Sequence, residues 1–313
     1  MLGKTAGGLF WMARYFERAE NTARLLETGQ RMALTRSHGA DDEWEPVLQT
    51  AGALQGYQAK YSEITKDNAV DWLLRDVDNP SSVRSVIKQA RDNARLVRTA
   101  LTYEVWSAVN GAWMRLDEQL KRRVGERDLP NVLELVRERT TLVRGAILGS
   151  MMRNDIYDFL RLGTFLERAD NVGRILDVKY FVLLPTAFSV GSSLDNVQWE
   201  IILRSIGAGG GYRMTRGQKS SPSDIADFLI LDERMPRSLS FCSRKLVENL
   251  GYLAKDYSTE LPSAKLASTL YEKFEGRAIS DIFEQGLHEY IEDVLSDLGQ
   301  VSAQIEIDYR FYE

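Results

Sequence analysis

The chain has 313 residues, of which 44% are hydrophobic, 27% are charged and seven are proline. This composition excludes a disordered or low-complexity chain, and the scarcity of proline favours helices because proline removes a helical hydrogen bond. The single cysteine, Cys242, excludes an internal disulfide, and the two histidines, His38 and His288, argue against a metal site rich in these ligands. The net charge of −5 does not indicate nucleic-acid binding. We therefore expect no bound metal, no cofactor and no nucleic acid.

Two short apolar runs are the nearest approach to a targeting or membrane segment. The run Leu9–Met12 is followed closely by Arg14, whereas the core of a signal peptide is longer and uncharged. The run Tyr180–Leu184 stops at Pro185, and a helix that spans a bilayer needs about 20 apolar residues. We expect no membrane segment, and the single free cysteine is consistent with the reducing cytoplasm.

The sequence contains an internal repeat. Residues 15–27 read YFERAENTARLLE and residues 165–177 read FLERADNVGRILD, at an offset of 150. Matches continue in the same order at offsets of 155 and 156, in these pairs: Trp44 and Trp199, Gly56-Tyr57 and Gly211-Tyr212, Asp71 and Asp227, Pro80 and Pro236, Ser82 and Ser238. Helical sequences of similar composition align easily, but paired Trp, Gly-Tyr and Pro residues are not typical of heptads. We expect one domain, residues 1–313, with repeats of about 1–150 and 151–313.

Nearly every segment has the periodicity of an amphipathic helix. Apolar residues recur in steps of three and four over residues 5–36, 80–101 and 277–311, and the last stretch predicts one helix of about 45–50 Å. Ser221-Pro222 predicts a helix start, as does its counterpart Thr65. We therefore expect an all-α fold, a bundle of about ten to twelve helices in two halves related by a pseudo-twofold axis.

A glycine cluster, Gly207 with Gly209–Gly211, precedes Arg213. Glycine-rich turns can direct backbone N–H groups at phosphate. No Gly-Lys-Ser/Thr sequence follows, however, and no predicted strand precedes the cluster, so neither a Walker motif nor a dinucleotide fingerprint is indicated. We interpret the cluster as a flexible connection between two helices.

The repeated segment carries a row of polar residues beside its apolar stripe. In the first copy these residues are Glu17, Arg18, Asn21 and Arg24. The second copy repeats them as Glu167, Arg168, Asn171 and Arg174. Helical spacing places most of each set on one face. Two interpretations stay open: a structural network of ion pairs, which we favour, and a ligand-binding or catalytic site in which Glu17 or Glu167 is the acid/base.

A second candidate is a row of five cations at helical spacing. The row consists of Arg84, Lys88, Arg91, Arg95 and Arg98. The second repeat does not copy it, since only Lys88 has a basic counterpart, Arg244. One interpretation is a site for phosphate, carboxylate or an acidic partner. The other, which we favour, is a solvated face whose cations pair with acids such as Glu27 or Glu104.

The ERAEN and ERADN segments resemble the signature of the alpha-E family, a bacterial all-helical family named for its Glu-Arg motif. The stretch from Asn79 to Asn110 and the stretch from Phe228 to Leu239 also resemble this family, so the likeness covers essentially the whole chain. The glycine run before Tyr212 is a departure. The resemblance implies an association with circularly permuted ATP-grasp proteins and transglutaminase-like proteins, in systems that ligate or modify peptides. It supplies no catalytic residues.

Three hypotheses follow for the function. The first is an accessory helical protein that binds an ATP-grasp ligase partner, or a peptide or anionic ligand, through the polar rows and the basic row. The second is an enzyme in which the paired Glu-Arg helices supply an acid/base and an anion clamp. The third is a structural bundle that forms oligomers through an exposed apolar patch.

Overall fold

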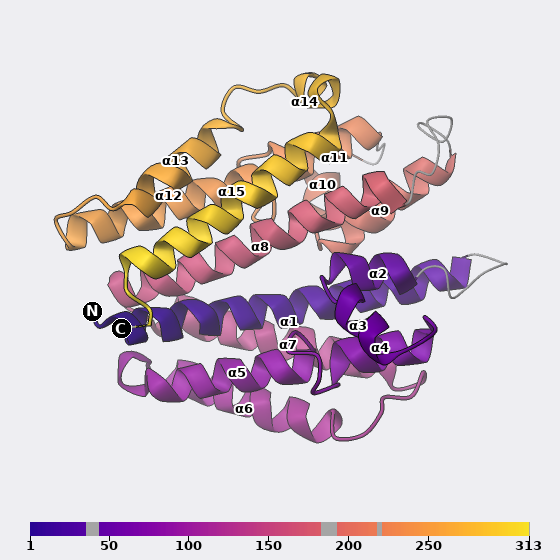
Figure 1. Ribbon diagram of the computed structural model, residues 1–313, viewed down its shortest axis with the longest axis horizontal. Coiled ribbons are helices and arrows are strands. Elements are labelled where there is room, and N and C mark those ends of the chain that lie inside the picture. The colour runs from indigo at the N-terminus through magenta and orange to yellow at the C-terminus, as the bar shows by residue number, and fades with distance from the viewer. Residues whose placement is uncertain (36–43, 183–192, 218–220, 313) are drawn as a thin grey trace. The chain divides into compact units, whose positions relative to one another are not determined.

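The computed structural model describes residues 1–35, 44–182, 193–217 and 221–312. The regular secondary structure in these ranges consists of fifteen α-helices and one 3₁₀ helix, with no strand (Figure 1). This confirms the all-α prediction. The chain divides into two compact units, unit 1 with Met1–Glu167 and the C-terminal residues from Tyr309, and unit 2 with Arg168–Asp308. The division falls inside one continuous helix, α8.

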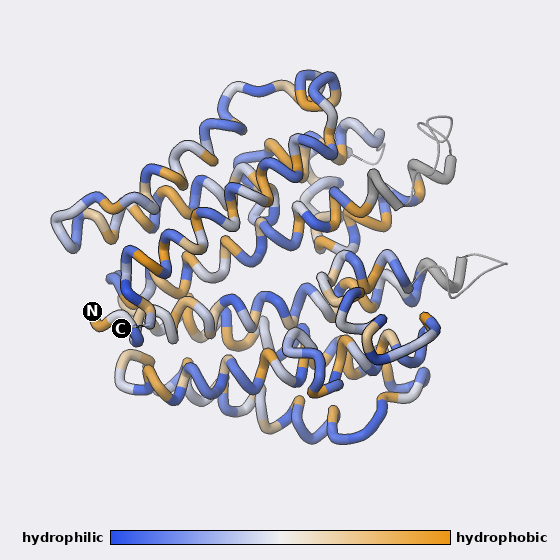
Figure 2. Tube along the Cα trace, viewed as in Figure 1, coloured by the Kyte–Doolittle hydropathy of each residue, from blue (hydrophilic) through white to orange (hydrophobic). Residues whose placement is uncertain are grey.

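Unit 1 is built around its first helix. Its helices are α1 (Gly3–Thr35), α2 (Trp44–Thr50), α3 (Leu54–Lys60), α4 (Lys66–Leu74), α5 (Val83–Leu96), η1 (Arg98–Ala100), α6 (Tyr103–Gln119), α7 (Leu129–Ser150) and the first part of α8 (Asp155–Val182). α5 and α7 both pack on α1, and α6 packs on α5 and α7. Figure 2 shows how apolar residues recur along these helices between polar ones, which is the pattern that buries one stripe of each helix.

Unit 2 contains the rest of α8 and seven further helices. These are α9 (Ser193–Ser205), α10 (Gly209–Arg216), α11 (Pro222–Ile230), α12 (Leu239–Asp256), α13 (Pro262–Glu272), α14 (Ile279–Gln285) and α15 (Leu287–Asp308). α13 packs on α12 and α15, and α11 packs on α9. Among the helices of the described ranges, none combines the length and apolar character that crossing a bilayer requires.

The predicted helix starts are confirmed. The hydroxyl of Ser221 accepts a hydrogen bond from the backbone N–H of Asp224 at 3.1 Å, and that of Thr65 accepts one from Asn68 at 3.3 Å. Such caps satisfy amides that a helix leaves without an internal partner. Ser82 and Ser238 cap α5 and α12 in the same way, and they are one of the matched pairs. These parallels support the duplication, which stays a prediction together with its pseudo-twofold axis.

The prediction of one long helix over residues 277–311 is wrong. The segment forms α14 and α15, which are separated at Gly286. The backbone of Gly286 has a φ of 104°, a value that residues with a Cβ rarely adopt, so the helix ends there. The apolar stripe continues across the break because Ile282, Leu287 and Tyr290 are all buried. Hydrophobic periodicity therefore does not reveal the interruption.

Three smaller expectations also need correction. The predicted helix over residues 80–101 is shorter, since α5 ends at Leu96 and η1 follows. The fifteen α-helices in the described ranges exceed the expected ten to twelve because several, such as α2, α3 and α14, have only seven residues. The glycine cluster is a connection only at Gly207 and Ala208, because Gly209 begins α10.

Candidate functional site

The Glu-Arg segment of α1 contacts the first part of α8 within unit 1. Arg14 and Arg18 lie one turn apart on α1, and both donate to the carboxylate of Glu167. Arg14 Nε is 2.8 Å from Glu167 Oε2, and Arg18 reaches Oε1 with Nε at 2.5 Å and Oε2 with Nη2 at 3.0 Å. The Arg14 guanidinium also lies over the ring of Trp11, 4.6 Å from its centroid. Both oxygens of this buried carboxylate are thus occupied.

A second buried carboxylate, Glu20, joins α1 to α7. Its side chain is 0% exposed. Arg24 donates to Glu20 Oε1 with Nη2 at 2.8 Å, and Arg144 of α7 donates to Oε2. Thr140 contacts the same oxygen at 3.4 Å, and Arg144 also lies 3.5 Å from Glu17 Oε2. We call this set the Glu-Arg network: Arg14, Glu17, Arg18, Glu20, Arg24, Arg144 and Glu167.

The pairing of α1 with α7 extends for two turns beyond the network. Glu27 of α1 binds Arg137 of α7, with 3.0 Å between Oε2 and Nη1. Glu20 and Glu27 are seven residues apart, as are Arg137 and Arg144, and the order along α7 is reversed. Seven residues are two helical turns, so the four side chains form two successive bridges between antiparallel helices.

The electrostatic environment keeps Glu167 ionised. Burial alone would raise the pKa of this carboxyl group, but the charges and hydrogen bonds of Arg18 and Arg14 outweigh burial and lower the pKa to about 2. A group with such a pKa carries no proton near neutrality and cannot act as a general acid there. This geometry therefore favours a structural role for Glu167, in which its ion pairs join α8 to α1, over a role in proton transfer.

The second Glu-Arg copy has different surroundings beyond Glu167. Arg168, in unit 2, is buried and donates through Nη1 to the backbone carbonyl of Pro236 at 3.0 Å. Arg174 is exposed and pairs with Asp170 four residues earlier, at 2.7 Å. Asn171 is half-buried, whereas its counterpart Asn21 in unit 1 is buried. Of the predicted residues, Glu17, Arg18, Arg24 and Glu167 are the ones that meet in the Glu-Arg network.

The basic row lies mainly along the contact between α5 and α6. Arg84 donates to Asp117 Oδ1 at 3.0 Å, and Arg91 donates to Asn110 Oδ1 at 2.9 Å. Arg98 continues this line, with its guanidinium 5.4 Å from the centroid of Trp106. These three arginines are spaced by seven residues, so Arg84 and Arg91 follow one side of α5 and Arg98, in η1, lies beyond the end of that helix.

The other two cations of the row are exposed. Lys88 pairs with Asp92 on its own helix at 2.7 Å. Arg95 has no hydrogen-bond or ion-pair partner among the residues described. The acids that pair with the row are therefore Asp117 and Asp92, whereas Glu27, which we had expected to do so, binds Arg137 and Arg31.

Sequence reasoning missed Arg14, Arg144 and Arg137 as members of the ionic contacts. The signal that could have identified Arg137 and Arg144 is their spacing of seven residues, which matches the spacing of Glu20 and Glu27 on α1. Comparing the two repeats does not reveal it. His38 lies outside the described residues. His288 lies in unit 2, with its Nδ1 2.5 Å from Asp177 Oδ1.

Comparison with known proteins gives one family match and several distant relatives. A family model described as a predicted alpha-helical domain with a conserved ER motif matches residues 1–309. Uncharacterized proteins of Mycobacterium bovis and Mycobacterium tuberculosis are each 24% identical over 93% of this chain. The match covers 34% of each relative, so the chain spans about a third of their length. No solved structure matches the chain.

The family description agrees with two features of the molecule. All the regular secondary structure of the described residues is helical, and Glu-Arg pairs occur at Glu17-Arg18 and Glu167-Arg168, on α1 and α8. The family match extends over nearly the entire sequence. The chain belongs to the Alpha-E family.

Proposed function

We propose that the chain is an accessory helical domain that binds a protein partner and is not itself a catalyst. The proposal rests on one observation: the buried carboxylates of the Glu-Arg network already have arginine partners. Glu167 is held by two arginines and Glu20 by two others, so these acids serve as ties between helices. An acid/base residue needs a pKa near the working pH and access to substrate. The pKa of Glu167, about 2, is far below that range.

The partner is proposed from the family resemblance. The matched segment of the mycobacterial relatives is a third of longer chains, which supports a domain that works beside other protein segments. We assign the partner to the circularly permuted ATP-grasp class, with a transglutaminase-like protein as a further component of a peptide-ligating or peptide-modifying system. We place this complex in the cytoplasm, since a cysteine that is buried and forms no disulfide, Cys242, suits a reducing compartment.

Exposed apolar side chains at one end of unit 1 supply a surface for this partner. They are Leu2, Leu96, Tyr103, Leu148 and Met152, which we call the apolar end. η1 connects the end of α5 to the start of α6, and Thr102 and Ser150 join the start of α6 to the end of α7 by a 2.7 Å hydrogen bond. Leu96 is 80% exposed and Tyr103 is 72% exposed. Apolar groups gathered on a surface are typical of protein interfaces.

Co-purification with the ATP-grasp protein of the same organism tests the proposal. We expect a complex at about 10 µM of each protein, and at least a tenfold loss of affinity in the Leu96→Ser/Tyr103→Ser double variant. Val77→Ser is the matched control because Val77 is also 72% exposed in unit 1 but lies between α4 and α5. Absence of a complex, or equal losses in both variants, would overturn the proposal.

The same variants separate the structural-oligomer hypothesis from partner binding. A bundle that self-associates through the apolar end would elute as an oligomer without any partner, and the double variant would become monomeric. Light scattering during size-exclusion chromatography measures this directly. A partner-binding domain instead keeps the same mass in wild type and variant when the ATP-grasp protein is absent.

A further inference from the structure

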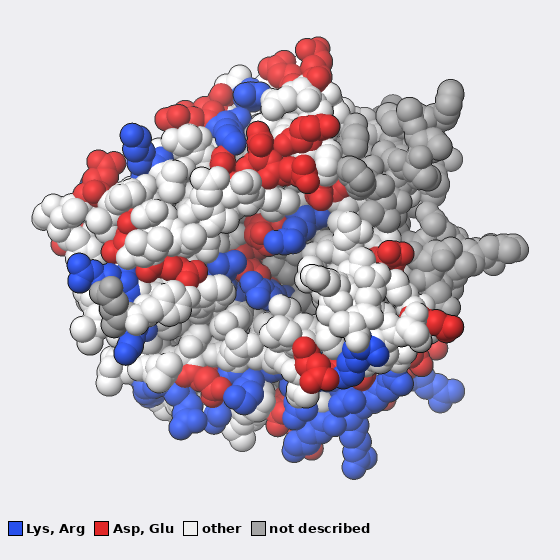
Figure 3. Space-filling model, in the orientation of Figure 1, with Lys and Arg blue, Asp and Glu red and all other residues white. Residues whose placement is uncertain are grey.

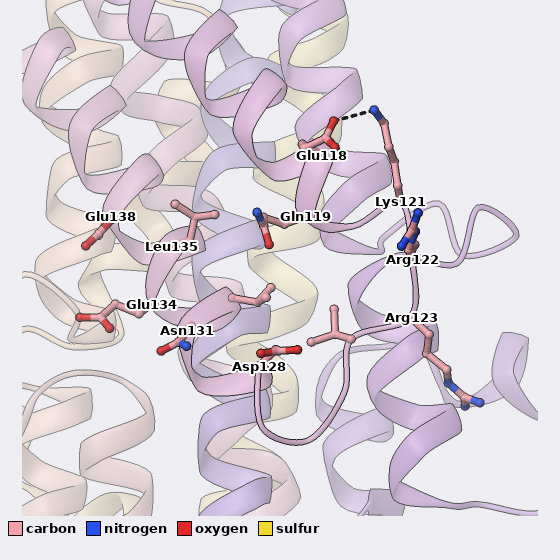
Figure 4. A pocket seen from close by; sticks show the side chains of 12 residues that line it. Glu118, Gln119, Lys121, Arg122, Arg123, Asp128, Asn131, Glu134, Leu135 and Glu138 are labelled. Atoms are coloured by element: carbon pink, nitrogen blue, oxygen red, sulfur yellow. Dashed lines mark hydrogen bonds and ion pairs between the residues drawn. The ribbon is translucent and has the colours of Figure 1, made fainter.

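A polar hollow of about 800 Å³ lies on unit 1 where α6 ends and α7 begins. Figure 4 shows its lining side chains, which come from the last turn of α6, the connecting segment and the first half of α7. The volume falls within the range of sites for small ligands and short peptides. The lining residues are Glu118, Gln119, Lys121, Arg122, Arg123, Val124, Asp128, Asn131, Val132, Glu134, Leu135 and Glu138.

The basic and acidic side chains of the hollow are largely separated, apart from Glu118, which pairs with Lys121, and Asp128 on the connecting segment. Lys121, Arg122 and Arg123 form a basic wall on the connecting segment, and Glu134 and Glu138 form an acidic wall on α7 (Figure 4). In Figure 3, lysine and arginine side chains crowd the surface of unit 1 near the end of α6, where the basic wall lies. Both kinds of charge are thus available to a ligand at separate positions.

Two side chains of the basic wall already interact with other residues of unit 1. Lys121 pairs with Glu118 at 2.6 Å, and Arg123 donates to Asn68 at 2.6 Å. Arg122, in contrast, is exposed and has no ion-pair or hydrogen-bond partner in the described part of the chain. Arg122 is therefore the cation of this wall that is available to an anion.

The acidic wall has no evident structural role. Glu134 and Glu138 are four residues apart on α7, where two like charges destabilise a helix slightly. The helix dipole does not compensate, because it favours acids only in the first turn and α7 begins at Leu129. Both glutamates are exposed, and neither has a cation partner among the described residues. Packing and helix stability therefore do not account for this pair.

We propose that the hollow binds a zwitterionic ligand of short-peptide size. Its carboxylate contacts Arg122, and its ammonium or guanidinium group contacts Glu134 and Glu138. Each contact is a charge-assisted hydrogen bond, and the two together select ligands that carry both charges. This inference does not rest on the proposed ATP-grasp partner, and the test below uses the isolated chain.

Calorimetric titration at low salt with blocked tetrapeptides tests the proposal. Acetyl-Lys-Ala-Ala-Glu-amide and its reverse, acetyl-Glu-Ala-Ala-Lys-amide, carry both charges, and replacing either charged residue by Gln gives the singly charged probes. We expect at least one doubly charged peptide to bind with a Kd of about 1 mM or below, and each singly charged version to bind about fivefold more weakly.

Variants assign each charge to its wall. Arg122→Gln should weaken the doubly charged peptide about fivefold and leave the peptide that lacks glutamate unaffected. Glu134→Gln/Glu138→Gln should weaken the doubly charged peptide and leave the peptide that lacks lysine unaffected. Arg115→Gln and Glu63→Gln are matched controls, since both residues are exposed in unit 1 and neither lines the hollow.

Three results would overturn the proposal. The first is no binding of either doubly charged peptide at about 10 mM. The second is equal binding of all six peptides, the two doubly charged ones and their four singly charged versions, which indicates contacts that do not depend on charge. The third is an equal effect of Arg122→Gln on every peptide, because the Arg122 contact would then not involve the ligand's carboxylate.

Discussion

Gly163 of α8 faces the backbone of Phe10 in α1 so closely that a Cβ atom on Gly163 would lie 2.2 Å from the Phe10 carbonyl oxygen. Gly163 precedes Glu167 by one helical turn, and Phe10 precedes Arg14 by one turn. The absence of a side chain lets the two helices approach, and this approach brings the carboxylate of Glu167 within reach of Arg14 and Arg18. The glycine and the ion pairs are therefore parts of one contact.

Replacing this glycine should destabilise unit 1 even though alanine favours helix. Gly163→Ala gains about 1 kcal/mol of helix propensity but forces α1 and α8 apart, which costs about 1–3 kcal/mol and weakens the ion pairs as well. We expect a net loss of about 1–2 kcal/mol in the free energy of unfolding. Gly145→Ala is the control, because a Cβ there meets nothing within 4 Å and should stabilise α7. Urea unfolding compares them, and equal stabilisation by both substitutions would refute the close approach.

Removing the charge of Glu167 should cost more than removing an exposed charge on the same helix. Glu167→Gln leaves Arg14 and Arg18 without their buried anion, and we expect a loss of roughly 3 kcal/mol in the free energy of unfolding. Asp170→Asn breaks a solvent-exposed pair with Arg174 and should cost about 0–1 kcal/mol. Denaturant titrations at neutral pH give both values. Similar losses for the two variants would mean that the Glu-Arg network is only a surface feature.

The low pKa of Glu167 predicts how stability depends on pH. In the unfolded chain this carboxyl group titrates near its ordinary pKa of 4.5, whereas in the folded protein it titrates at about 2. Between these values the unfolded state binds more protons, so stability is complete above pH 4.5 and falls as the pH drops towards 2. The contribution of Glu167 to this loss is about 3 kcal/mol.

The Glu167→Gln variant isolates this contribution. The difference in unfolding free energy between wild type and variant should be largest near neutrality and should shrink between pH 4.5 and pH 2. A difference that stays constant across this window would show that the ion pairs do not depress the pKa. Unfolding in urea at a series of pH values measures the effect.

Local features were predictable from the sequence because their causes are local. The caps at Ser221 and Thr65 follow from a hydroxyl and an amide three residues apart. The all-α fold follows from periodicity that each segment carries by itself. Gly286 was missed because the apolar stripe continues on both sides of it and only the backbone angle changes.

The Glu-Arg network was predictable only in part, for a reason that lies in the repeat itself. Comparing the two copies selects residues that both share, such as Glu17 and Glu167. Arg14 is not shared, since Thr164 occupies the equivalent position at the offset of 150. Arg144 lies on α7, outside the repeated segment. Comparing the two copies therefore identifies the acids but not Arg14 and Arg144, the arginines that bind them.

The basic row should separate into structural and exposed members. Arg91→Gln removes a hydrogen bond that joins α5 to α6 and should lower the unfolding free energy by about 1 kcal/mol. Arg95→Gln should change it by less than about 0.5 kcal/mol, because Arg95 is exposed and has no partner in the described chain. Thermal unfolding distinguishes them. A larger loss for Arg95→Gln would point to a partner for Arg95 that is absent from this arrangement.

The break between α14 and α15 should depend on Gly286. A residue with a Cβ is strained at its φ of 104°, so Gly286→Ala should cost about 1–3 kcal/mol. Gly299→Ala provides the control, because Gly299 is inside α15 and a Cβ there meets nothing within 4 Å. That substitution should stabilise the protein by about 0.5–1 kcal/mol. If Gly286→Ala also stabilises the protein and increases its helical circular dichroism signal, then tertiary packing does not require the break and the continuous helix is the lower-energy arrangement.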